Sequence, residues 1–358
     1  MKKVVLVLCA LVSLLTFAES KILQSVYVPD MTFLYECDLK ALGAMEGIEE
    51  KLAKVDDVPF SDMLKLNAST EKMLKALGLD PKKDLVKLNM VAALTGEQLS
   101  AIQKMQKNEK VDKVPFCGAV ETLKPIDVAA APEAITTYIS EIGAGGSCTQ
   151  FKVGELTGLK LKMPPSTNSK LEEVSLVFPA DGKGVVFGTE ELVRAAMERY
   201  VSGKLNQLPF SFEELKKISK PNSHYCFMFK MPAEVQGDLK KKAIAAAQVN
   251  PMEAGVLGEI ANVSGVSLTC NVGDKGLSIV ISTQLPTPEN AMSFKNSLLD
   301  GLVKPMLTML VTQYAQQQLS FIEGMKTSLE GNVARIETLL TFDDIKGIAG
   351  FANQLPQN

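Results

Sequence analysis

The sequence predicts an α+β protein of two related halves, each a mostly antiparallel sheet with helices packed on one face, and a long helix in the C-terminal half. Three observations predict this class. Short apolar runs of strand length occur in pairs around glycine-containing turns, which is typical of hairpins. Stretches with apolar residues three or four positions apart, which is typical of helices, separate these pairs. A hairpin that leads into a helix occurs twice.

The first 20 residues have the three parts of a bacterial secretory signal peptide. Lys2 and Lys3 form a charged start, the apolar run 4–17 carries no charge, and residues 18–20 (Ala-Glu-Ser) place small residues where signal peptidase reads them. The run is shorter than the roughly 20 residues that a membrane span needs. We expect cleavage near Ser20, no transmembrane anchor in the mature chain, and a periplasmic or secreted protein. An uncleaved N-terminal anchor is the alternative.

The N-terminal α+β half comprises residues 21–205. Alternation predicts strands at 32–39, 86–94 and 114–122, and helical spacing predicts helices that contain Leu42, Met45, Ile48 and Leu52, then 69–78, and 132–142. Gly78 is placed to end the second of these helices, and Asp80-Pro81 has the pattern of an N-cap before an N1 proline. A hairpin or bent strand follows at 151–163, then a hairpin with arms 171–178 and 184–187, and then an amphipathic helix capped by Thr189.

The C-terminal α+β half comprises residues 206–358 and follows a linker at 203–211. We expect a strand at 224–231, a helix at about 233–248, a hairpin at 266–282, and a last hairpin that turns at 330–332. Thr287-Pro288-Glu289 predicts the start of a helix that extends to about residue 326, with a kink or break at Pro305. A short helix from Asp343 ends the chain.

The proposed relation between the halves rests on a short repeat. Val-Ser-Leu occurs at 174–176 and 266–268, and Lys-Gly occurs at the same spacing after each, at 183–184 and 275–276. Both copies are expected to be hairpins that lead into a helix opened by threonine. Chance is the alternative explanation, because glycine is common in hairpin turns.

Charge and histidine content exclude several classes of function. The formal net charge is −3, and no basic patch of the kind that binds nucleic acid is present. His224 is the only histidine, so one chain cannot build a two-histidine metal site, and any Ser–His or Cys–His pair would have to use it. We therefore expect no cofactor, no metal and no nucleic-acid partner.

The cysteines offer two candidate disulfides, because disulfides persist outside the cytoplasm. Cys117 with Cys148 and Cys226 with Cys270 are the pairs that each stay within one half. The alternative is that these cysteines are buried thiols that pack as small apolar side chains.

An uncharged run at 305–322 is the candidate ligand-binding segment. Its glutamines, threonines and serine disfavour membrane insertion. Leu302, Met306, Met309 and Leu310 could form one face of a site for an apolar ligand, since methionine suits adaptable surfaces. Ordinary core packing is the alternative.

Two other patterns suggest catalysis only weakly. Residues 143–147 (GAGGS) lack the lysine and the spacing of a phosphate-binding loop, which favours a simple loop. Acidic doublets at 56–57, 172–173, 213–214 and 343–344 could supply the paired carboxylates of a hydrolase, but solvated faces and first turns of helices also explain them.

Four segments resemble a group of secreted bacterial α+β proteins of unknown function. They are GLDPKKDL at 78–85, VVFGTEELVRAAMERY at 185–200, GDKGLSIVIS at 273–282 and LEGNVARIETLLTFDDI at 329–345. The resemblance implies an exported protein that is not an enzyme, and it supplies no catalytic residues.

The expected function is that of a non-catalytic extracytoplasmic binding, scaffold or envelope-associated protein, whose partner is an envelope protein or a hydrophobic ligand. The alternatives are a carrier of a hydrophobic or lipid-like ligand and a hydrolase that uses carboxylates only.

Overall fold

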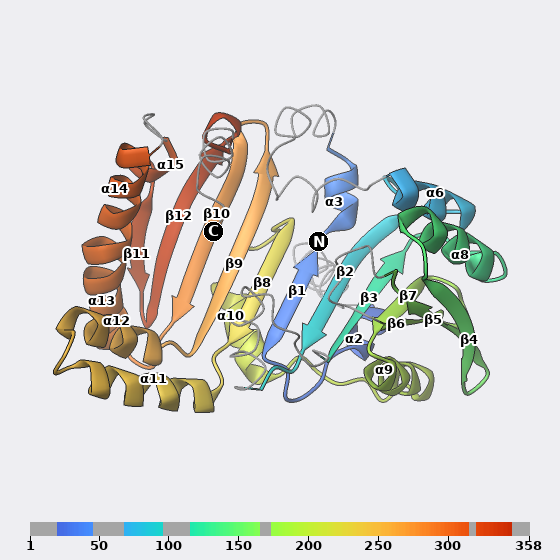
Figure 1. The fold of residues 1–358 in the computed structure, drawn as a ribbon, viewed down its shortest axis with the longest axis horizontal. Helices are drawn as coiled ribbons and strands as arrows, with labels where there is room; N and C mark the ends of the chain where they lie inside the picture. The colour runs from blue at the N-terminus through green and yellow to red at the C-terminus, as the bar shows by residue number, and fades with distance from the viewer. Residues whose placement is uncertain (1–19, 46–67, 96–114, 165–172, 315–319, 346–358) are drawn as a thin grey trace, which may run out of the picture.

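A computed structural model of the chain describes residues 20–45, 68–95, 115–164, 173–314 and 320–345. One antiparallel sheet of 12 strands runs through this part of the chain, in the order β11-β12-β10-β9-β8-β1-β2-β3-β7-β6-β5-β4 (Figure 1). The α+β class predicted from the sequence is confirmed.

Most strands follow the predicted apolar runs, although the hairpin expected at 151–163 begins earlier, at Ser147. The strands are β1 (Phe33–Cys37), β2 (Leu85–Ala92), β3 (Phe116–Thr122), β4 (Ser147–Val153), β5 (Leu156–Lys162), β6 (Glu173–Val177), β7 (Gly184–Gly188), β8 (Tyr225–Lys230), β9 (Gly265–Gly273), β10 (Gly276–Gln284), β11 (Lys326–Glu330) and β12 (Val333–Thr341).

The helices connect these strands and lie on both sides of the sheet. They are α2 (Lys21–Ser25), α3 (Leu39–Gly43), α6 (Ala68–Ala76), α8 (Ala131–Ile142), α9 (Glu190–Ser202), α10 (Phe210–Ile218), α11 (Ala233–Ala246), α12 (Pro251–Ala261), α13 (Pro288–Ser293), the π-helix η2 (Phe294–Val303), α14 (Lys304–Tyr314) and α15 (Ser320–Glu323). None of the helices in the described ranges is long and apolar enough to span a bilayer.

The strand registers define two faces, because successive side chains of a strand point to opposite sides. On what we call the α9 face, Leu34 of β1 lies between Val91 and Met228. On what we call the α8 face, Tyr35 lies between Met90 and Phe227. Every other side chain can be assigned to a face from these two rows.

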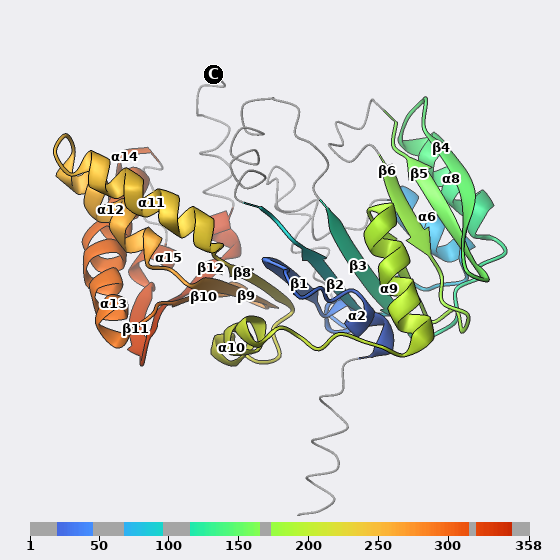
Figure 2. The same cartoon turned by 90° about the horizontal axis from the view of Figure 1, so that it is seen from below.

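Different helices cover the two faces, whereas the sequence suggested helices on one face only. α2, α9 and α10 pack on the α9 face, in a core that includes Leu23, Val193, Met197, Phe212 and Leu215. Each of these large buried side chains contributes about 1.5–3 kcal/mol. α8 and α6 cover one end of the α8 face, and α12, α13 and η2 cover the other end. Figure 2 shows the sheet from below with these helices on opposite sides.

A buried ion pair fixes α10 to the sheet. The Lys216 ammonium lies 2.8 Å from the carboxylate of Glu36, which also has Lys87 at 3.6 Å. Glu36 is buried at the centre of β1 on the α9 face. A buried carboxylate needs such partners, because an unpaired charge in a protein interior is strongly destabilising.

The two predicted halves share the single sheet. β1 of the first half pairs along its whole length with β8 of the second half, from Phe33 opposite Phe229 to Cys37 opposite Tyr225. The repeated hairpins are present as β6–β7 and β9–β10. The helices after them differ, however, because α9 packs on the α9 face and α13 packs on the α8 face.

The predicted disulfides are wrong, because the five cysteines in the described ranges are all free. Strands β7, β6 and β5 separate Cys117 on β3 from Cys148 on β4. Cys226 and Cys270 lie on adjacent strands, but Cys226 is opposite Thr269 and Cys270 is opposite Tyr225, so their side chains point to opposite faces. A disulfide requires Cβ atoms about 4 Å apart. The alternative interpretation, buried thiols, fits most of them.

Three N-caps of helices were predicted, and the structure confirms the one at Thr287 but not those at Thr189 and Asp80. The Thr287 hydroxyl accepts a hydrogen bond from the Asn290 backbone N–H, as expected of an N-cap. Thr189 makes no such bond, and its hydroxyl instead donates to the carbonyl of Phe116 on β3. Asp80-Pro81 begins a turn rather than a helix, because the Asp84 carboxylate accepts the Asp80 N–H and closes the loop.

The long predicted helix is present from Pro288 to Tyr314, but its middle is a π-helix. Residues 294–303 adopt the wider turn, and regular α-helix resumes at Lys304, one residue before Pro305. A π-helical segment shifts hydrogen bonding by one residue, which suits a proline that has no N–H to donate. The predicted kink site therefore lies at a change of helix type.

Candidate functional site

A band of partly exposed apolar side chains crosses the centre of the α8 face. The central row runs from Met90 through Tyr35, Phe227 and Leu268 to Ile281, one residue from each of β2, β1, β8, β9 and β10. Phe33 and Phe229 lie beside it in the next row. We call these seven residues the apolar band.

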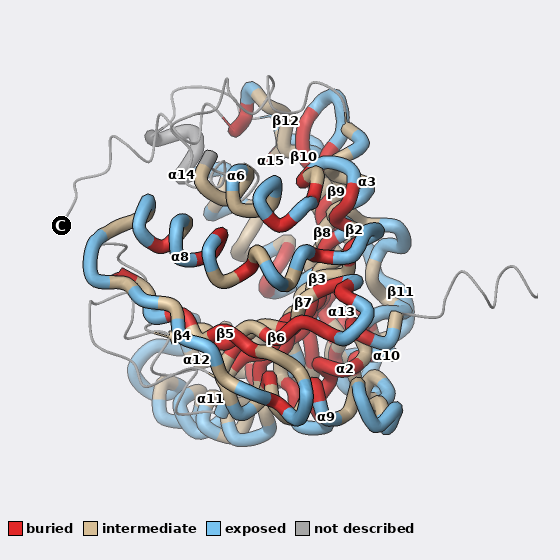
Figure 3. The backbone as a smooth tube through the Cα atoms, turned by 90° about the vertical axis from the view of Figure 1, so that its right-hand side faces the viewer, coloured by how far each residue is buried: buried red, intermediate tan, exposed pale blue. Residues whose placement is uncertain are grey.

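The band is accessible at its centre. Phe227 is 39% exposed, and the other six members are partly buried. Of the described helices, α6, α8, α12, α13 and η2 pack over the two ends of this face, and α3 contributes Leu42 beside Tyr225 of β8. The strands in Figure 3 are mostly red or tan, which mark buried and intermediate residues, so an exposed phenylalanine in the middle of the sheet departs from the pattern. Contiguous exposed apolar surface is typical of a binding site.

Aromatic pairs hold the band in place. The Phe33 and Phe227 rings meet edge to face with centroids 4.5 Å apart. Tyr35 stacks on Tyr225 with centroids 6.5 Å apart. Such pairs contribute about 0.5–1.5 kcal/mol beyond the area that they bury, so the rings form a fixed surface.

The apolar band is uncharged at neutral pH, and so is the row on its other side, which contains Cys37, Tyr225 and Cys270. Burial, with smaller contributions from nearby cysteines, raises the pKa of Tyr35 and of Tyr225 far above their usual range. Burial likewise raises the pKa of Cys37 and of Cys270 to about 11. No member of the band carries a carboxylate, an ammonium or a guanidinium group. The surface therefore favours an uncharged, apolar ligand.

The row Leu88, Cys37, Tyr225, Cys270 and Ile279 closes one side of the band. Part of this row packs beneath Leu42 and Met45, which follow β1, and beneath Ile345. The accessible part of the α8 face is consequently narrow along the strands and long across them.

Sequence reasoning placed the apolar ligand face elsewhere. Leu302 packs on the core beneath η2, with Val266 and Ile336 of the sheet. Met306 and Met309 are 44% and 52% exposed on α14, and the side chain of Leu310 lies outside the described residues. The alternation of Phe33 with Tyr35, and of Tyr225 with Phe227 and Phe229, was the sequence signal that could have located the band.

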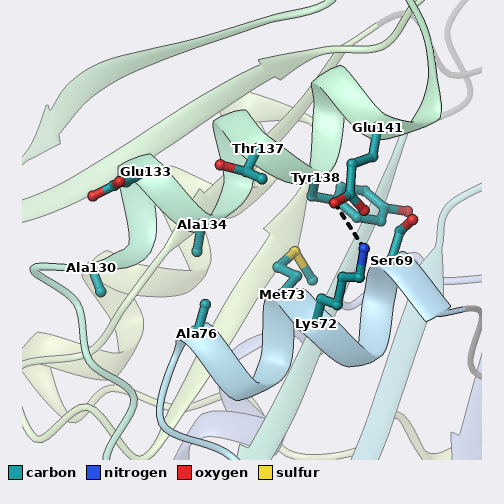
Figure 4. A pocket seen from close by; sticks show the side chains of 10 residues that line it. All are labelled: Ser69, Lys72, Met73, Ala76, Ala130, Glu133, Ala134, Thr137, Tyr138 and Glu141. Atoms are coloured by element: carbon teal, nitrogen blue, oxygen red, sulfur yellow. Dashed lines mark hydrogen bonds and ion pairs between the residues drawn. The ribbon is translucent and has the colours of Figure 1, made fainter.

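Two shallow hollows lie near α8, away from the band. One, of about 330 Å³, lies between α6 and α8, with Met73 and Ala76 facing Ala134 and the Lys72–Glu141 ion pair across one end (Figure 4). The other, of about 400 Å³, is lined by the Gly143–Ser147 loop and Cys148. Both are open to solvent, and in the first the Ser69 hydroxyl hydrogen-bonds to the Glu141 carboxylate, which also pairs with Lys72.

The lone histidine and a buried cysteine show no features of a catalytic pair in the described residues. The Nδ1 atom of His224 accepts the Val272 backbone N–H at 2.9 Å, which joins β8 to β9. Burial raises the pKa of the Cys117 thiol to about 12, which makes it a poor nucleophile. The described residues contain no group of three His, Cys, Asp or Glu side chains that could hold a metal ion.

The acidic doublets are likewise tied into the fold. Glu173 pairs with Lys160, and Glu214 pairs with Lys217. The Asp344 carboxylate accepts hydrogen bonds from the backbone N–H and hydroxyl groups of Thr341 and Ser320. Residues 56–57 and Glu172 lie outside the described residues.

Comparison with known proteins gives no family for the chain. No protein-family model and no curated protein matches the sequence. Crystal forms I and III of TP0453 are similar over 94% and 93% of this chain and 98% of theirs, with 14% identity and a TM-score of 0.42 in both cases. Crystal form IV of TP0453 is similar over 92% of this chain and 96% of its own, with 12% identity and a TM-score of 0.41.

Proposed function

We propose that the protein is a non-catalytic extracytoplasmic binding protein, and that it holds an apolar ligand on the apolar band. The observation that carries this proposal is the 39% exposure of Phe227 within an uncharged aromatic surface at the centre of the sheet. Leaving such a surface in contact with water costs roughly 25 cal/mol for each Å² of apolar area. A ligand that covers it recovers this free energy.

Binding of Nile red, an uncharged apolar fluorophore, tests the site. We expect the wild-type protein to enhance its emission and Phe227→Ser to weaken binding about tenfold, which corresponds to about 1.4 kcal/mol. Phe210→Ser is the matched control, because Phe210 is 72% exposed but lies on α10, which packs on the opposite face. Equal binding by the wild type and Phe227→Ser would exclude the band as the site.

The extracytoplasmic location rests on the signal sequence. Sequencing the N-terminus of protein isolated from its native source should give a chain that begins just after Ser20, close to the start of α2 at Lys21. A chain that still begins at Met1 and fractionates with cytosolic components would contradict this part of the proposal.

The natural occupant can be identified directly. Mass spectrometry of organic extracts from the exported, mature protein should detect a small apolar molecule, and Phe227→Ser should retain less of it. A protein retained by the wild type but not by Phe227→Ser would instead indicate a scaffold or envelope-associated role for the same surface.

A further inference from the structure

One end of the apolar band is closed by a phenylalanine that lies over a glycine. In the central row, the position next to Met90 on β3 is Gly118, and the next on β7 is Phe187. A Cβ atom at position 118 would lie 2.4 Å from the Phe187 ring, so the ring occupies the space that a side chain would take. Phe187 also contacts Phe116 edge to face, at a centroid separation of 6.3 Å.

The other end of the row passes beneath helices. Beyond Ile281 the row reaches Ile336 on β12, which packs with Leu302 of η2 and Val256 of α12. The row between these two ends thus spans five strands, from Met90 to Ile281, with Phe227 exposed at its centre and the other four members partly buried. With neighbouring strands about 4.8 Å apart, its length is roughly 19 Å.

We propose that Phe187 is the end wall of this site and sets the length of an unbranched alkyl or acyl chain lying across the strands. The inference rests on the function proposed above. A linear chain is the occupant that fits, because the row is long and uncharged, and the row containing Cys37 and Tyr225 restricts its width. Because Gly118 has no side chain, the Phe187 ring can lie over it, in the space where a longer alkyl chain would otherwise continue.

Straight-chain saturated primary alcohols of increasing length, which carry no charge, test the wall. We measure the dissociation constant of each for the wild type, Phe187→Ala and Phe151→Ala. Removing the Phe187 ring frees the space over Gly118, which extends the row by about one strand spacing. The chain length that binds most tightly should therefore increase. Each additional buried methylene should improve affinity about fourfold, so the affinity ratio of the longer to the shorter chains should rise at least tenfold.

Phe151→Ala is the matched control. The Phe151 ring lies over Gly158 in the same way, at 2.6 Å from the position of a Cβ atom, but on the α9 face. This variant loses the same ring from the same arrangement, away from the band. It should keep the length preference of the wild type, even if it unfolds at a lower temperature.

A second variant covers the case in which Phe187→Ala does not fold. Gly118→Ala adds a methyl group against the Phe187 ring, on the strand next to Met90, and should favour shorter chains by a similar factor. A folded Phe187→Ala or Gly118→Ala protein with the wild-type length preference overturns the end wall but leaves the proposed function intact. If the wild type binds a chain of no length, the end wall is overturned too. If the wild type also fails to bind Nile red, the proposed function is overturned as well.

Discussion

At the scale of single residues, His224 makes stability depend on pH. Burial lowers the pKa of its imidazole below the ordinary value near 6.5, against a smaller opposite effect of Asp38. The unfolded chain therefore takes up a proton at a higher pH than the folded protein does. The free energy of unfolding should fall as the pH drops from about 6.5 towards the folded pKa, and this contribution should be constant above that window.

The His224→Asn variant isolates the effect, because asparagine can accept the Val272 N–H without titrating. We expect its melting temperature to change less between pH 7.5 and 5.5 than that of the wild type. The depressed pKa values of Asp80 and Asp84 act at lower pH, since these carboxyls start from an ordinary value near 3.8. Equal pH dependence of the two proteins would show that His224 does not titrate in this range.

The Asp344 carboxylate should be costly to neutralise, because it is buried and accepts four hydrogen bonds. Burial acts to raise its pKa, but hydrogen bonds from Thr341 and Ser320 outweigh burial and lower it. Asp344→Asn cannot accept all four bonds, so we expect a loss of about 1.5–3 kcal/mol in urea unfolding at neutral pH. Asp30→Asn, at an exposed position, is the control and should change stability by less than about 0.5 kcal/mol.

At the scale of elements, the conformation of two glycines predicts opposite effects of one substitution. Gly255 lies inside α12, and nothing lies within 4 Å of the position of its Cβ atom. Gly203 ends α9, also in open space, but at a φ of 71°. Gly255→Ala should raise the free energy of unfolding by about 0.5–1 kcal/mol, and Gly203→Ala should lower it by a similar amount. Thermal melts of the two variants compare the signs directly.

Local pattern was enough to predict most elements. The Thr287-Pro288-Glu289 cap and the glycines at hairpin turns act within a few residues, so they could be recognised without tertiary contacts. α2, α10 and α12 were not predicted. α10 begins inside the segment taken as a linker, and its helical form depends on burying Phe212 and Leu215 against β8 and β9. That stabilisation comes from residues distant in the sequence.

The order of strands and the candidate site lie beyond what local pattern can predict. Alternation shows that Phe33 and Tyr35 share a face, as do Phe227 and Phe229, but it does not show that β1 and β8 are neighbours. The band exists only because β1 and β8 pair, although nearly 200 residues separate them in the sequence. The disulfide prediction failed for the same reason, because the face to which each cysteine points depends on register.

At the scale of the whole molecule, the β1–β8 pairing makes the two halves one cooperative unit. Leu34 is fully buried at the centre of β1, between Val91 and Met228, so Leu34→Ala should cost about 2–5 kcal/mol. Because the sheet is continuous, amide protection should fall both in β6–β7 and in β9–β10, on either side of the substitution. Hydrogen exchange with peptide resolution measures both hairpins in one experiment.

Leu339→Ala provides the comparison, since Leu339 is 40% exposed on β12 and should change stability by no more than about 0.5 kcal/mol. Two independently folding halves would give a different result: protection in β9–β10 would be unchanged by Leu34→Ala, and unfolding would occur in two steps. The backbone hydrogen bonds between β1 and β8 favour a single step, because opening that junction would expose a row of unpaired N–H and C=O groups together with the buried side chains of Leu34 and Met228.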